Sequence, residues 1–398
     1  MARSESAAQS FSLDDKYTRT EGRIALNGIQ ALVRLPLDQA RRDRAAGLRI
    51  GTYVTGYQGS PLGELDKQMR MAGRILDEHD VHFEPGINED MAATAIYGSQ
   101  FLDLFPHGRY DGVLGIWYGK APGLDRSGDI LRHAQFAGTS THGASLLLTG
   151  DDPSCKSTTL PSDSTVALYD LVYPTFYPGN PQEVLEHGLH AVAMSRYSGM
   201  WTALKIVTNV ADGGGIIEVH PDQAKPVIPE LELHGKPFRK LQDLAMIPPH
   251  NLDVERMIFA ERLEAAKAYA RVNRLNRIAV RGPRDRLGLV AAGKTYDDLR
   301  LALDMLGLRD DDLRAAGIRL YKLALLFPIE PQGLREFAEG LEELIVVEEK
   351  RGFLELQLCH ELYNLPQRPN VYGKFTPAGA PLFPMHDELQ PDQIAVLL

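Results

Sequence analysis

Short apolar segments alternate with longer amphipathic segments along most of this chain, and this alternation constrains the fold more than any other feature. The segment "LRIGTYVTG" predicts a buried strand, and "LGELDKQMRMAGRIL" predicts the helix that follows it. Further strands are predicted at "VHFEPG", "GVLGIWYG", "ASLLLTG" and "WTALKIVT", with helical sequence between them. Strands that alternate with helices form mostly parallel sheets covered on both faces. The sequence therefore predicts an α/β fold with open, mostly parallel sheets and helices on both faces.

A change of composition at Ala211 predicts two such sheets. With 398 residues the chain is too long for a single core. The stretch "ADGGGIIEVHPDQAKPVIPELELHGKPF" is rich in Gly and Pro, and alternation resumes beyond it at "LGLVAAG". Before the first predicted strand, helical periodicity from Ile24 to Val33 predicts one helix. We predict a loose N-terminus (1–20), a first domain (21–210), a linker with a helix (211–280) and a second, smaller domain (281–398).

Charge and cysteine content exclude several classes of function. The net charge is −10 and no long basic run occurs, which argues against binding to a nucleic-acid backbone. The two cysteines, Cys155 and Cys359, lie far apart and cannot supply four thiolates to an iron–sulfur cluster. No stretch approaches the ~18 apolar residues of a membrane span, and the N-terminus has no apolar core of signal-peptide length. These observations predict a cytoplasmic protein that binds neither nucleic acid nor membrane.

Four polar loops follow predicted strands of the first domain, at the edge where open parallel sheets bind ligands. Gly59 in the first loop lets backbone approach a ligand closely, and Ser60 offers a hydroxyl group. In the second, Asn88 caps a helix and places Glu89 in its first turn. Purely structural explanations also exist: a tight connection, a carboxylate that complements a helix dipole, a salt-bridged loop and a solvated loop. The loops are "TGYQGSP", "PGINEDMAATA", "GKAPGLDRSGDILRHA" and "GDDPSCKSTTLPSDS".

Taken together and in this order, the loops resemble the pyrimidine-binding domain of the thiamine-diphosphate-dependent 2-oxoacid:ferredoxin oxidoreductases. The long bacterial indolepyruvate:ferredoxin oxidoreductases are the most similar members. The resemblance extends over roughly residues 15–390, and "GKAPGLDRSGD" is its most specific part. It implies a thiamine-diphosphate-binding fold for the first domain and a transketolase C-terminal-like fold, generally used for assembly, for the second. The other pieces that carry it are "GYQGSP", "NEDMAATA", "GDDPSCKSTT" and "VVEEKRGFLELQL".

The resemblance also implies roles for individual residues. Glu89 corresponds to the glutamate that contacts the aminopyrimidine N1′ of thiamine diphosphate, where a carboxyl group exchanges a proton with the ring, and it is the predicted catalytic residue. The predicted substrate-binding residues, which approach the 2-oxo acid, are Gly59, Ser60 and Pro61. Besides Glu89, the predicted cofactor-binding residues are Tyr57, Lys120, Asp125 and Arg126. We predict no metal ligand on this chain.

The diphosphate of this cofactor needs a second module, marked by Gly-Asp-Gly with an Asn downstream. The nearest stretch here, "ADGGG" at 211–215, has no matching Asn. We therefore expect thiamine diphosphate to be shared with a partner that holds the diphosphate and Mg²⁺. Partners should also carry the iron–sulfur clusters and a ferredoxin-linked acceptor subunit, while coenzyme A takes the acyl group. The hypothesis is the pyrimidine-domain half of an oxidoreductase for aryl pyruvates such as indolepyruvate, in a homo- or hetero-oligomer.

Two other functions stay open at this point. The chain can be a non-catalytic binding or assembly protein that keeps the fold, or a different α/β enzyme that binds a phosphorylated ligand through "GKAPGLDRSGD". The phosphate-binding alternative lacks support, because "GKTYDD" at Gly293 has neither the glycine spacing nor the residue pattern of a Walker A motif. A neighbouring reading frame with a Gly-Asp-Gly…Asn domain would favour the oxidoreductase over the assembly protein.

Overall fold

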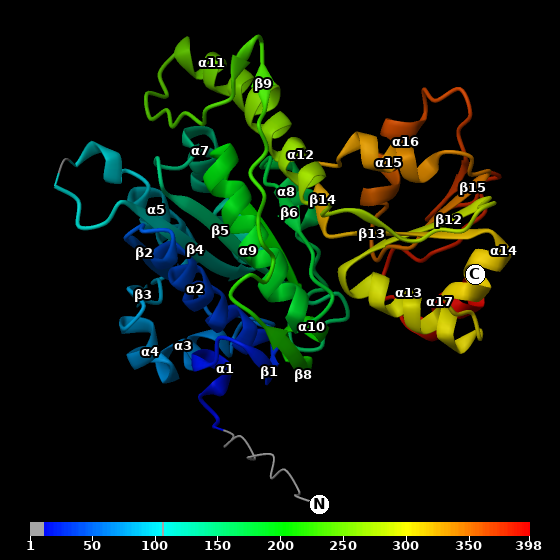
Figure 1. Cartoon of the computed structure of the whole chain (residues 1–398), viewed down its shortest axis with the longest axis horizontal. Helices are drawn as coiled ribbons and strands as arrows, with labels where there is room; N and C mark the ends of the chain where they lie inside the picture. The colour runs from blue at the N-terminus through cyan, green and yellow to red at the C-terminus, as the bar shows by residue number, and fades with distance from the viewer. Residues whose placement is uncertain (1–11, 106) are drawn as a thin grey trace, which may run out of the picture.

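The structure, a computed structural model, describes residues 12–105 and 107–398 (Figure 1). A seven-stranded sheet with the order β14-β6-β7-β5-β4-β2-β3 is the centre of the first half. Neighbouring strands are parallel throughout this sheet except at the β14–β6 edge. Its strands are β2 (Ile50–Gly56), β3 (Val81–Phe83), β4 (Gly112–Lys120), β5 (Ala144–Asp151), β6 (Thr175–Phe176), β7 (Thr202–Val207) and β14 (Leu325–Phe327).

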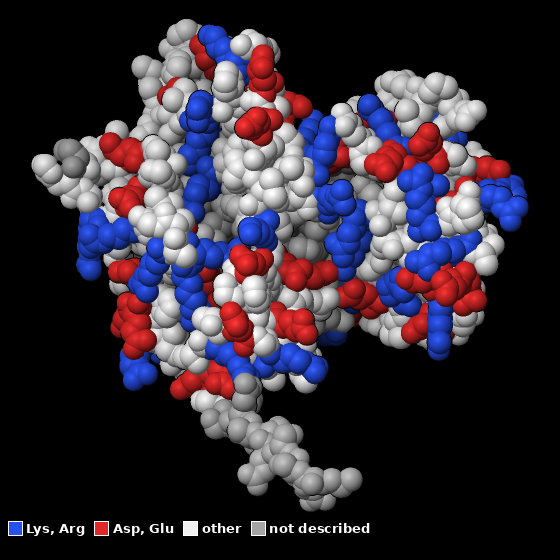
Figure 2. All heavy atoms as spheres, viewed as in Figure 1, with Lys and Arg blue, Asp and Glu red and all other residues white. Residues whose placement is uncertain are grey.

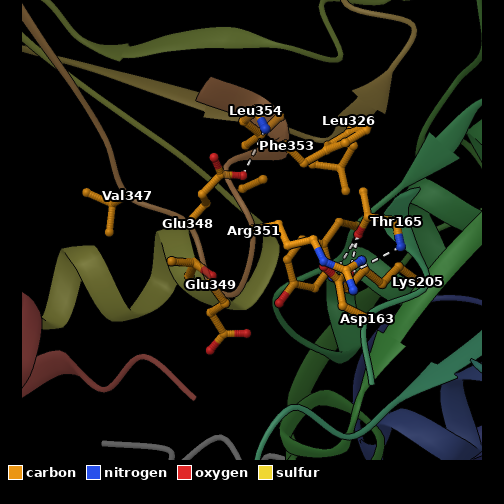
Figure 3. A pocket seen from close by; sticks show the side chains of 13 residues that line it. Asp163, Thr165, Lys205, Leu326, Val347, Glu348, Glu349, Arg351, Phe353 and Leu354 are labelled. Atoms are coloured by element: carbon orange, nitrogen blue, oxygen red, sulfur yellow. Dashed lines mark hydrogen bonds and ion pairs between the residues drawn. The ribbon is translucent and has the colours of Figure 1, made fainter. Parts of the chain in front are cut away.

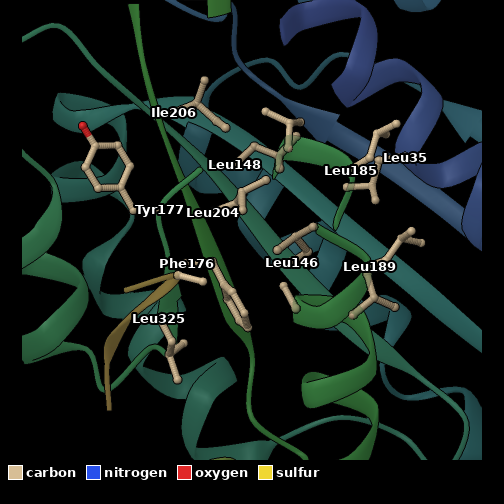
Figure 4. Packing of buried hydrophobic residues seen from close by; sticks show 14 of the residues in the cluster. Leu35, Leu146, Leu148, Phe176, Tyr177, Leu185, Leu189, Leu204, Ile206 and Leu325 are labelled. Atoms are coloured by element: carbon tan, nitrogen blue, oxygen red, sulfur yellow. The ribbon is translucent and has the colours of Figure 1, made fainter. Parts of the chain in front are cut away.

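Helices cover both faces of this sheet because successive side chains of each strand point to opposite sides. On one face, Leu146 and Leu148 of β5 pack with Leu35 of α2 and Leu185 of α9 (Figure 4). On the other face, Leu147 belongs to a separate apolar cluster with side chains of α5 and α7. The helices of this half include α2 (Gly28–Ala45), α3 (Leu65–Met71), α4 (Gly73–Asp77), α5 (Glu89–Ser99), α6 (Ala121–Arg126), α7 (Gly128–Ala137), α8 (Thr165–Asp170), α9 (Pro181–Ser198) and α10 (Thr208–Asp212), with a 3-10 turn at Leu102–Leu104.

A five-stranded sheet with the order β11-β13-β12-β15-β16 forms the second half. Only β11 runs antiparallel to its neighbour, so the predicted fold of two mostly parallel sheets with helices is confirmed. The strands are β11 (Arg277–Val280), β12 (Leu287–Ala292), β13 (Ile318–Leu323), β15 (Glu343–Val346) and β16 (Asn370–Tyr372). The helices are α13 (Gly293–Met305), α14 (Asp310–Ala316), α15 (Pro331–Ala338), α16 (Phe353–Leu362) and α17 (Pro391–Leu397).

The segment before the first sheet differs from the prediction. Residues 1–11 of the expected loose N-terminus lie outside the described residues, but Tyr17 in helix α1 (Asp15–Thr18) is buried. The stretch predicted as one helix begins with strand β1 (Gly22–Asn27). Asn27 ends this strand and starts helix α2, because its Oδ1 accepts a hydrogen bond from Gln30 N at 2.8 Å and its own N–H donates one to Gln30 Oε1 at 3.1 Å.

The predicted linker at 211–280 also contains regular structure. Strand β8 (Gly214–Val219) pairs antiparallel with β1 and closes a small ribbon beside the first sheet. Strand β11 belongs to the second sheet, so that sheet begins before the predicted boundary at 281. The rest is a short hairpin, β9 (Glu232–Leu233) and β10 (Lys236–Pro237), followed by α11 (His250–Met257), a π-helical turn (Ile258–Arg262) and α12 (Leu263–Val272).

The two halves are joined by more than the chain that links them. Strand β14 comes from the second half and completes the edge of the first sheet beside β6. Lys322 forms a buried ion pair with Glu183 across the junction. Acidic and basic side chains are interspersed on the face drawn in Figure 2, over both halves. Within the described residues, no helix is both long and apolar enough to span a membrane.

Candidate functional site

Strands β2, β4 and β5 are parallel neighbours, so the loops that follow them emerge at one edge of the first sheet. The helix α5 loop reaches the same edge, because Gly86 N donates a hydrogen bond to Gly56 O at 2.7 Å. The structure thus brings together the four loops that the sequence predicts to form a site. The roles predicted for their side chains are not tested by this geometry alone.

The first loop lies directly on the ends of β4 and β5. A Cβ atom on Gly56 would be 2.0 Å from Tyr118 O, so glycine is required for this approach. Gly59 packs on the aliphatic part of Lys120, and Pro61 packs on Gly150. The Ser60–Pro61 peptide bond is cis, and the Ser60 hydroxyl is hydrogen-bonded to the Ser157 hydroxyl of the fourth loop. The predicted substrate-binding residues are therefore in contact with two other loops.

Glu89 is the first residue of α5 and is 7% exposed. The helix start is held by Asn88, whose Oδ1 accepts a hydrogen bond from Met91 N at 2.9 Å, and by Trp117 Nε1, which donates to Glu89 O at 3.1 Å. The carboxylate lies against Gly123, where a Cβ would be 2.7 Å from Oε1. Within residues 12–105 and 107–398 this carboxylate has no hydrogen-bond or ion-pair partner. Its oxygens are not among the fully buried polar atoms that lack a partner, so a ligand that reaches this edge of the sheet can contact them.

The third loop is largely helical, contrary to the prediction of an irregular loop. Lys120 precedes α6 and is half-buried, whereas Asp125 and Arg126 on α6 are exposed. Arg126 lies 3.8 Å from Asp90, the residue that follows Glu89. The third loop is therefore partly held by an ion pair, as the structural alternative of a salt-bridged loop expects. The same contact keeps Arg126 of α6 near Glu89 at the start of α5.

The fourth loop is organised around Asp152, which is fully buried. Its carboxylate accepts hydrogen bonds from the N–H groups of Lys156, Ser157 and Thr158 at 2.8–3.0 Å. Partial desolvation alone would raise the pKa of Asp152, but these N–H donors lower it below its usual value. The loop is therefore an ordered turn that presents the Ser157 hydroxyl to the first loop, and the structural alternative of a merely solvated connection does not describe it.

A buried cluster behind the fourth loop was not predicted from the sequence. Lys205 Nζ lies 2.7 Å from Asp163 and 3.9 Å from Asp151, all nearly inaccessible to water. Burial raises the pKa of Asp151, whereas for Asp163 the lysine outweighs burial and lowers the pKa. A lysine inside the apolar strand "WTALKIVT" is the signal in the sequence that could have indicated this cluster.

The cluster faces the second half of the chain across a small cavity (Figure 3). The cavity volume is about 30 Å³, which has room for water and not for an organic substrate. On the far side of the cavity, burial raises the pKa of Glu348 to about 7, although hydrogen bonds from the backbone N–H groups of Glu355 and Leu354 act to lower it. The cavity is therefore part of the junction between the halves and lies outside the candidate site.

Three exposed apolar side chains lie in the first two loops of the candidate site and at the start of α5. Ile87 is 79% exposed and Met91 is 56% exposed, on either side of Glu89, and Tyr57 of the first loop is also exposed. Large apolar side chains that remain exposed together commonly mark a surface for a partner.

Comparisons with known proteins find similarity in the second half of the chain and along most of its length. Residues 277–398 match the family described as "Indolepyruvate oxidoreductase domain". Over 91% of its length the chain is also 26% identical to "Indolepyruvate oxidoreductase subunit IorA" of Methanothermobacter marburgensis, and over 87% it is 24% identical to that subunit of Archaeoglobus fulgidus. The resemblance predicted from the sequence is confirmed. The chain spans about half the length of these curated relatives, 52% and 50%.

Two solved structures have a fold similar to that of this chain. The first, a 2-oxoglutarate:ferredoxin oxidoreductase from Magnetococcus marinus with 2-oxoglutarate, coenzyme A and succinyl-CoA bound, has a TM-score of 0.64 and 15% identity, and the match covers 94% of this chain and 64% of that one. The second, a split-gene transketolase described as an inactive beta4 tetramer, has a TM-score of 0.51 and 12% identity, over 92% and 96% of the two chains. At these identities the similarity shows the fold alone.

Proposed function

We propose that this chain is the pyrimidine-domain half of a thiamine-diphosphate-dependent 2-oxoacid:ferredoxin oxidoreductase. The proposed reaction is the oxidative decarboxylation of an aryl pyruvate such as indolepyruvate to an acyl-CoA, completed with a partner that carries the diphosphate module. The observation that supports it most is Glu89, a residue only 7% exposed whose carboxylate has no partner among the described residues, at the sheet edge where the four loops meet. The IorA relatives and the indolepyruvate oxidoreductase domain support the same class of reaction.

The residues of this chain fit one end of the cofactor. Glu89 would hold and move a proton at N1′ of the aminopyrimidine, and Tyr57 and Lys120 line the same edge. Gly59, Ser60 and Pro61 would face the 2-oxo acid, with Asp125 and Arg126 at the exposed rim. Thiamine diphosphate, when bound, would supply the electron sink that the cleavage of a 2-oxo acid requires.

The other end of the cofactor is proposed to lie on a partner. Among the described residues no group of three or more His, Cys, Asp or Glu side chains converges on a metal position. We assign the diphosphate, its Mg²⁺ and the iron–sulfur clusters to partner subunits, together with a ferredoxin-linked acceptor. The exposed side chains of Ile87, Met91 and Tyr57 are the proposed contact surface for the diphosphate module. Both cysteines are free, which agrees with a cytoplasmic location.

Co-purification tests this proposal directly. The chain is expressed with the products of the neighbouring reading frames, and 2-oxo-acid-dependent reduction of a viologen dye is measured with coenzyme A. Indolepyruvate and phenylpyruvate should support reduction better than pyruvate or 2-oxoglutarate. A stable complex that reduces no dye with any 2-oxo acid would favour the assembly-protein alternative and overturn the proposed activity.

The chain alone should bind thiamine diphosphate weakly or not at all. Charged diphosphate and Mg²⁺ contacts provide most of the anchoring in such a site, and we assign them to the partner. Titration calorimetry of the purified chain with thiamine diphosphate and Mg²⁺ should show no low-micromolar binding, whereas the complex with the partner should bind. Tight binding to the lone chain would contradict the proposed division of the site.

Gly123→Ala should reduce turnover without lowering stability. The new Cβ would clash with the Glu89 carboxylate, and a displacement of about 1 Å in a catalytic group can reduce the rate as much as 10²-fold. Alanine is otherwise the better helix residue, so α6 itself should not be weakened.

The matched control for this variant is Gly128→Ala, because a Cβ at Gly128 meets open space at the start of α7. Turnover of the complex and the melting temperature are measured for both variants. Equal turnover of Gly123→Ala and Gly128→Ala would show that the position of Glu89 does not matter for the reaction.

A further inference from the structure

We propose that the second half of the chain positions the substrate loop of the first half, with Lys350 as the positioning residue, and so contributes to the binding of the 2-oxo acid. This inference rests on the proposed function. It assigns a role in the site to a domain whose resemblance implies assembly alone.

The path of contacts begins at Lys350, in the loop after β15. Its Nζ donates a hydrogen bond to Pro153 O, 197 residues away in the fourth loop of the first half. The backbone is strained at Lys350 and at Cys155, two residues after Pro153: each has a φ of 56°, in the left-handed region that residues with a side chain rarely adopt. Such strain persists where surrounding contacts enforce it, often at functional sites.

A second contact from the same half reaches the fourth loop at Lys156. Its Nζ lies 3.4 Å from the buried carboxylate of Glu388 and 2.8 Å from Asn209 Oδ1. Glu388 in turn is bound by Lys294 at 3.0 Å and by Asn209 Nδ2 at 2.6 Å. The loop is thus attached to the second half on both sides of Cys155.

The other end of the fourth loop is held by aromatic side chains. Tyr169 of α8, which directly follows the loop, packs edge-to-face with Phe327 at 5.0 Å and with Phe353 at 5.6 Å between ring centroids. Both phenylalanines belong to the second half. Removing that half would therefore remove contacts at both ends of the loop.

Inside the loop, the Asp152 carboxylate transmits this attachment to the site. Its hydrogen bonds to the backbone of residues 156–158 fix the turn that carries Ser157. The Ser157 hydroxyl bonds to Ser60, the residue proposed to face the 2-oxo acid. A rigid path of hydrogen bonds therefore runs from Lys350 to Ser60.

The reactivity of Cys155 measures this attachment without any catalytic assay. The chain has two cysteines, so in a Cys359→Ser background the reaction of a thiol reagent reports on the fourth loop alone. Lys350→Met keeps most of the side-chain length and removes the donor, and Lys350→Arg keeps a donor. Arg286→Gln is the control, because Arg286 is an exposed charge of the second half paired only with Glu342 among the described residues.

We expect Cys155 to react about tenfold faster in Lys350→Met than in the parent, because a hydrogen bond from a charged donor that holds the loop closed is lost. Lys350→Arg should restore a rate close to the parent, and Arg286→Gln should not change it. In the complete enzyme, Lys350→Met should raise the KM for the 2-oxo acid about tenfold with a smaller change in kcat, as expected for lost substrate binding.

A double-mutant cycle tests the path itself. If Lys350 acts through Ser157, Lys350→Met should add little to the KM of a Ser157→Ala enzyme. The proposal would be overturned if the effects of Lys350→Met and Ser157→Ala on KM were fully additive. It would also be overturned if Lys350→Met had the same Cys155 rate and the same KM as Arg286→Gln. If the wild-type complex shows no dye reduction that depends on a 2-oxo acid, the proposed function and the named substrate are overturned. The Cys155 rates do not depend on that activity, and they alone decide whether the second half holds the loop.

Discussion

Replacing Glu89 with glutamine should leave the fold intact and remove most of the turnover of the complete enzyme. The amide keeps the shape of the side chain against Gly123 but cannot exchange a proton with the aminopyrimidine ring. Loss of a positioned acid–base group commonly reduces the rate by about 10²–10⁴-fold. Binding of the cofactor should change little, because its diphosphate and metal contacts are proposed to lie on the partner. Turnover, cofactor affinity and melting temperature are measured on the same preparation.

The opposite pattern is expected if Glu89 only complements the start of α5. In that case Glu89→Gln should lose roughly 0.3–1 kcal/mol of stability and keep its turnover. Asp392→Asn provides a matched control, since Asp392 is an exposed carboxylate in the first turn of α17, in the second half of the chain. A variant Glu89→Gln that melts like Asp392→Asn and turns over like the wild type would identify Glu89 as a structural residue.

The sheets could be predicted from the sequence because their strands are buried on both faces. Strand β5, "ASLLLTGD", is a continuous apolar run, which is how a central parallel strand reads. Strand β1 could not be predicted in this way. Its apolar residues Ile24 and Leu26 also fit the helical spacing of Ile29 and Leu32, and its partner β8 lies far along the chain. Pairing between distant segments leaves no local pattern to find.

In the candidate site, too, local features could be predicted from the sequence and contacts between distant segments could not. Asn88 predicts the start of α5 and so the place of Glu89, because a capping side chain acts within one turn. The contact of Glu89 with Gly123, the bond between Ser60 and Ser157 and the attachment of Lys350 depend on how separate loops meet in space. Their roles in the reaction stay predictions until the variants are measured.

The ion-pair cluster around Lys294 should be the most sensitive point for stability. Lys294 Nζ lies within 2.8–3.1 Å of carboxylate oxygens of Asp298, Glu349 and Glu388. Burial alone would lower the pKa of Lys294, but these carboxylates raise it above its usual value. Burial raises the pKa of Asp298 to about 6 even beside the lysine. The lysine charge therefore balances three acids that have little contact with water.

Lys294→Met should lower the free energy of unfolding by about 3–5 kcal/mol at pH 8, because it leaves buried carboxylates without a counter-charge. Without the lysine, the pKa of Asp298 in the folded state should rise further above its unfolded value. A carboxyl group whose pKa is higher in the folded than in the unfolded state destabilises the fold when it is ionised, and this cost disappears when it takes up a proton. The loss of stability of Lys294→Met relative to the wild type should therefore shrink as the pH falls from 8 to 5.5. Urea unfolding at both pH values measures it. Lys267→Met, which removes a half-exposed pair with Glu264, should lose at most about 1 kcal/mol and show no such dependence. Equal losses in the two variants at both pH values would show that the cluster does not hold the second half together, and would also weaken the attachment of the substrate loop through Glu388.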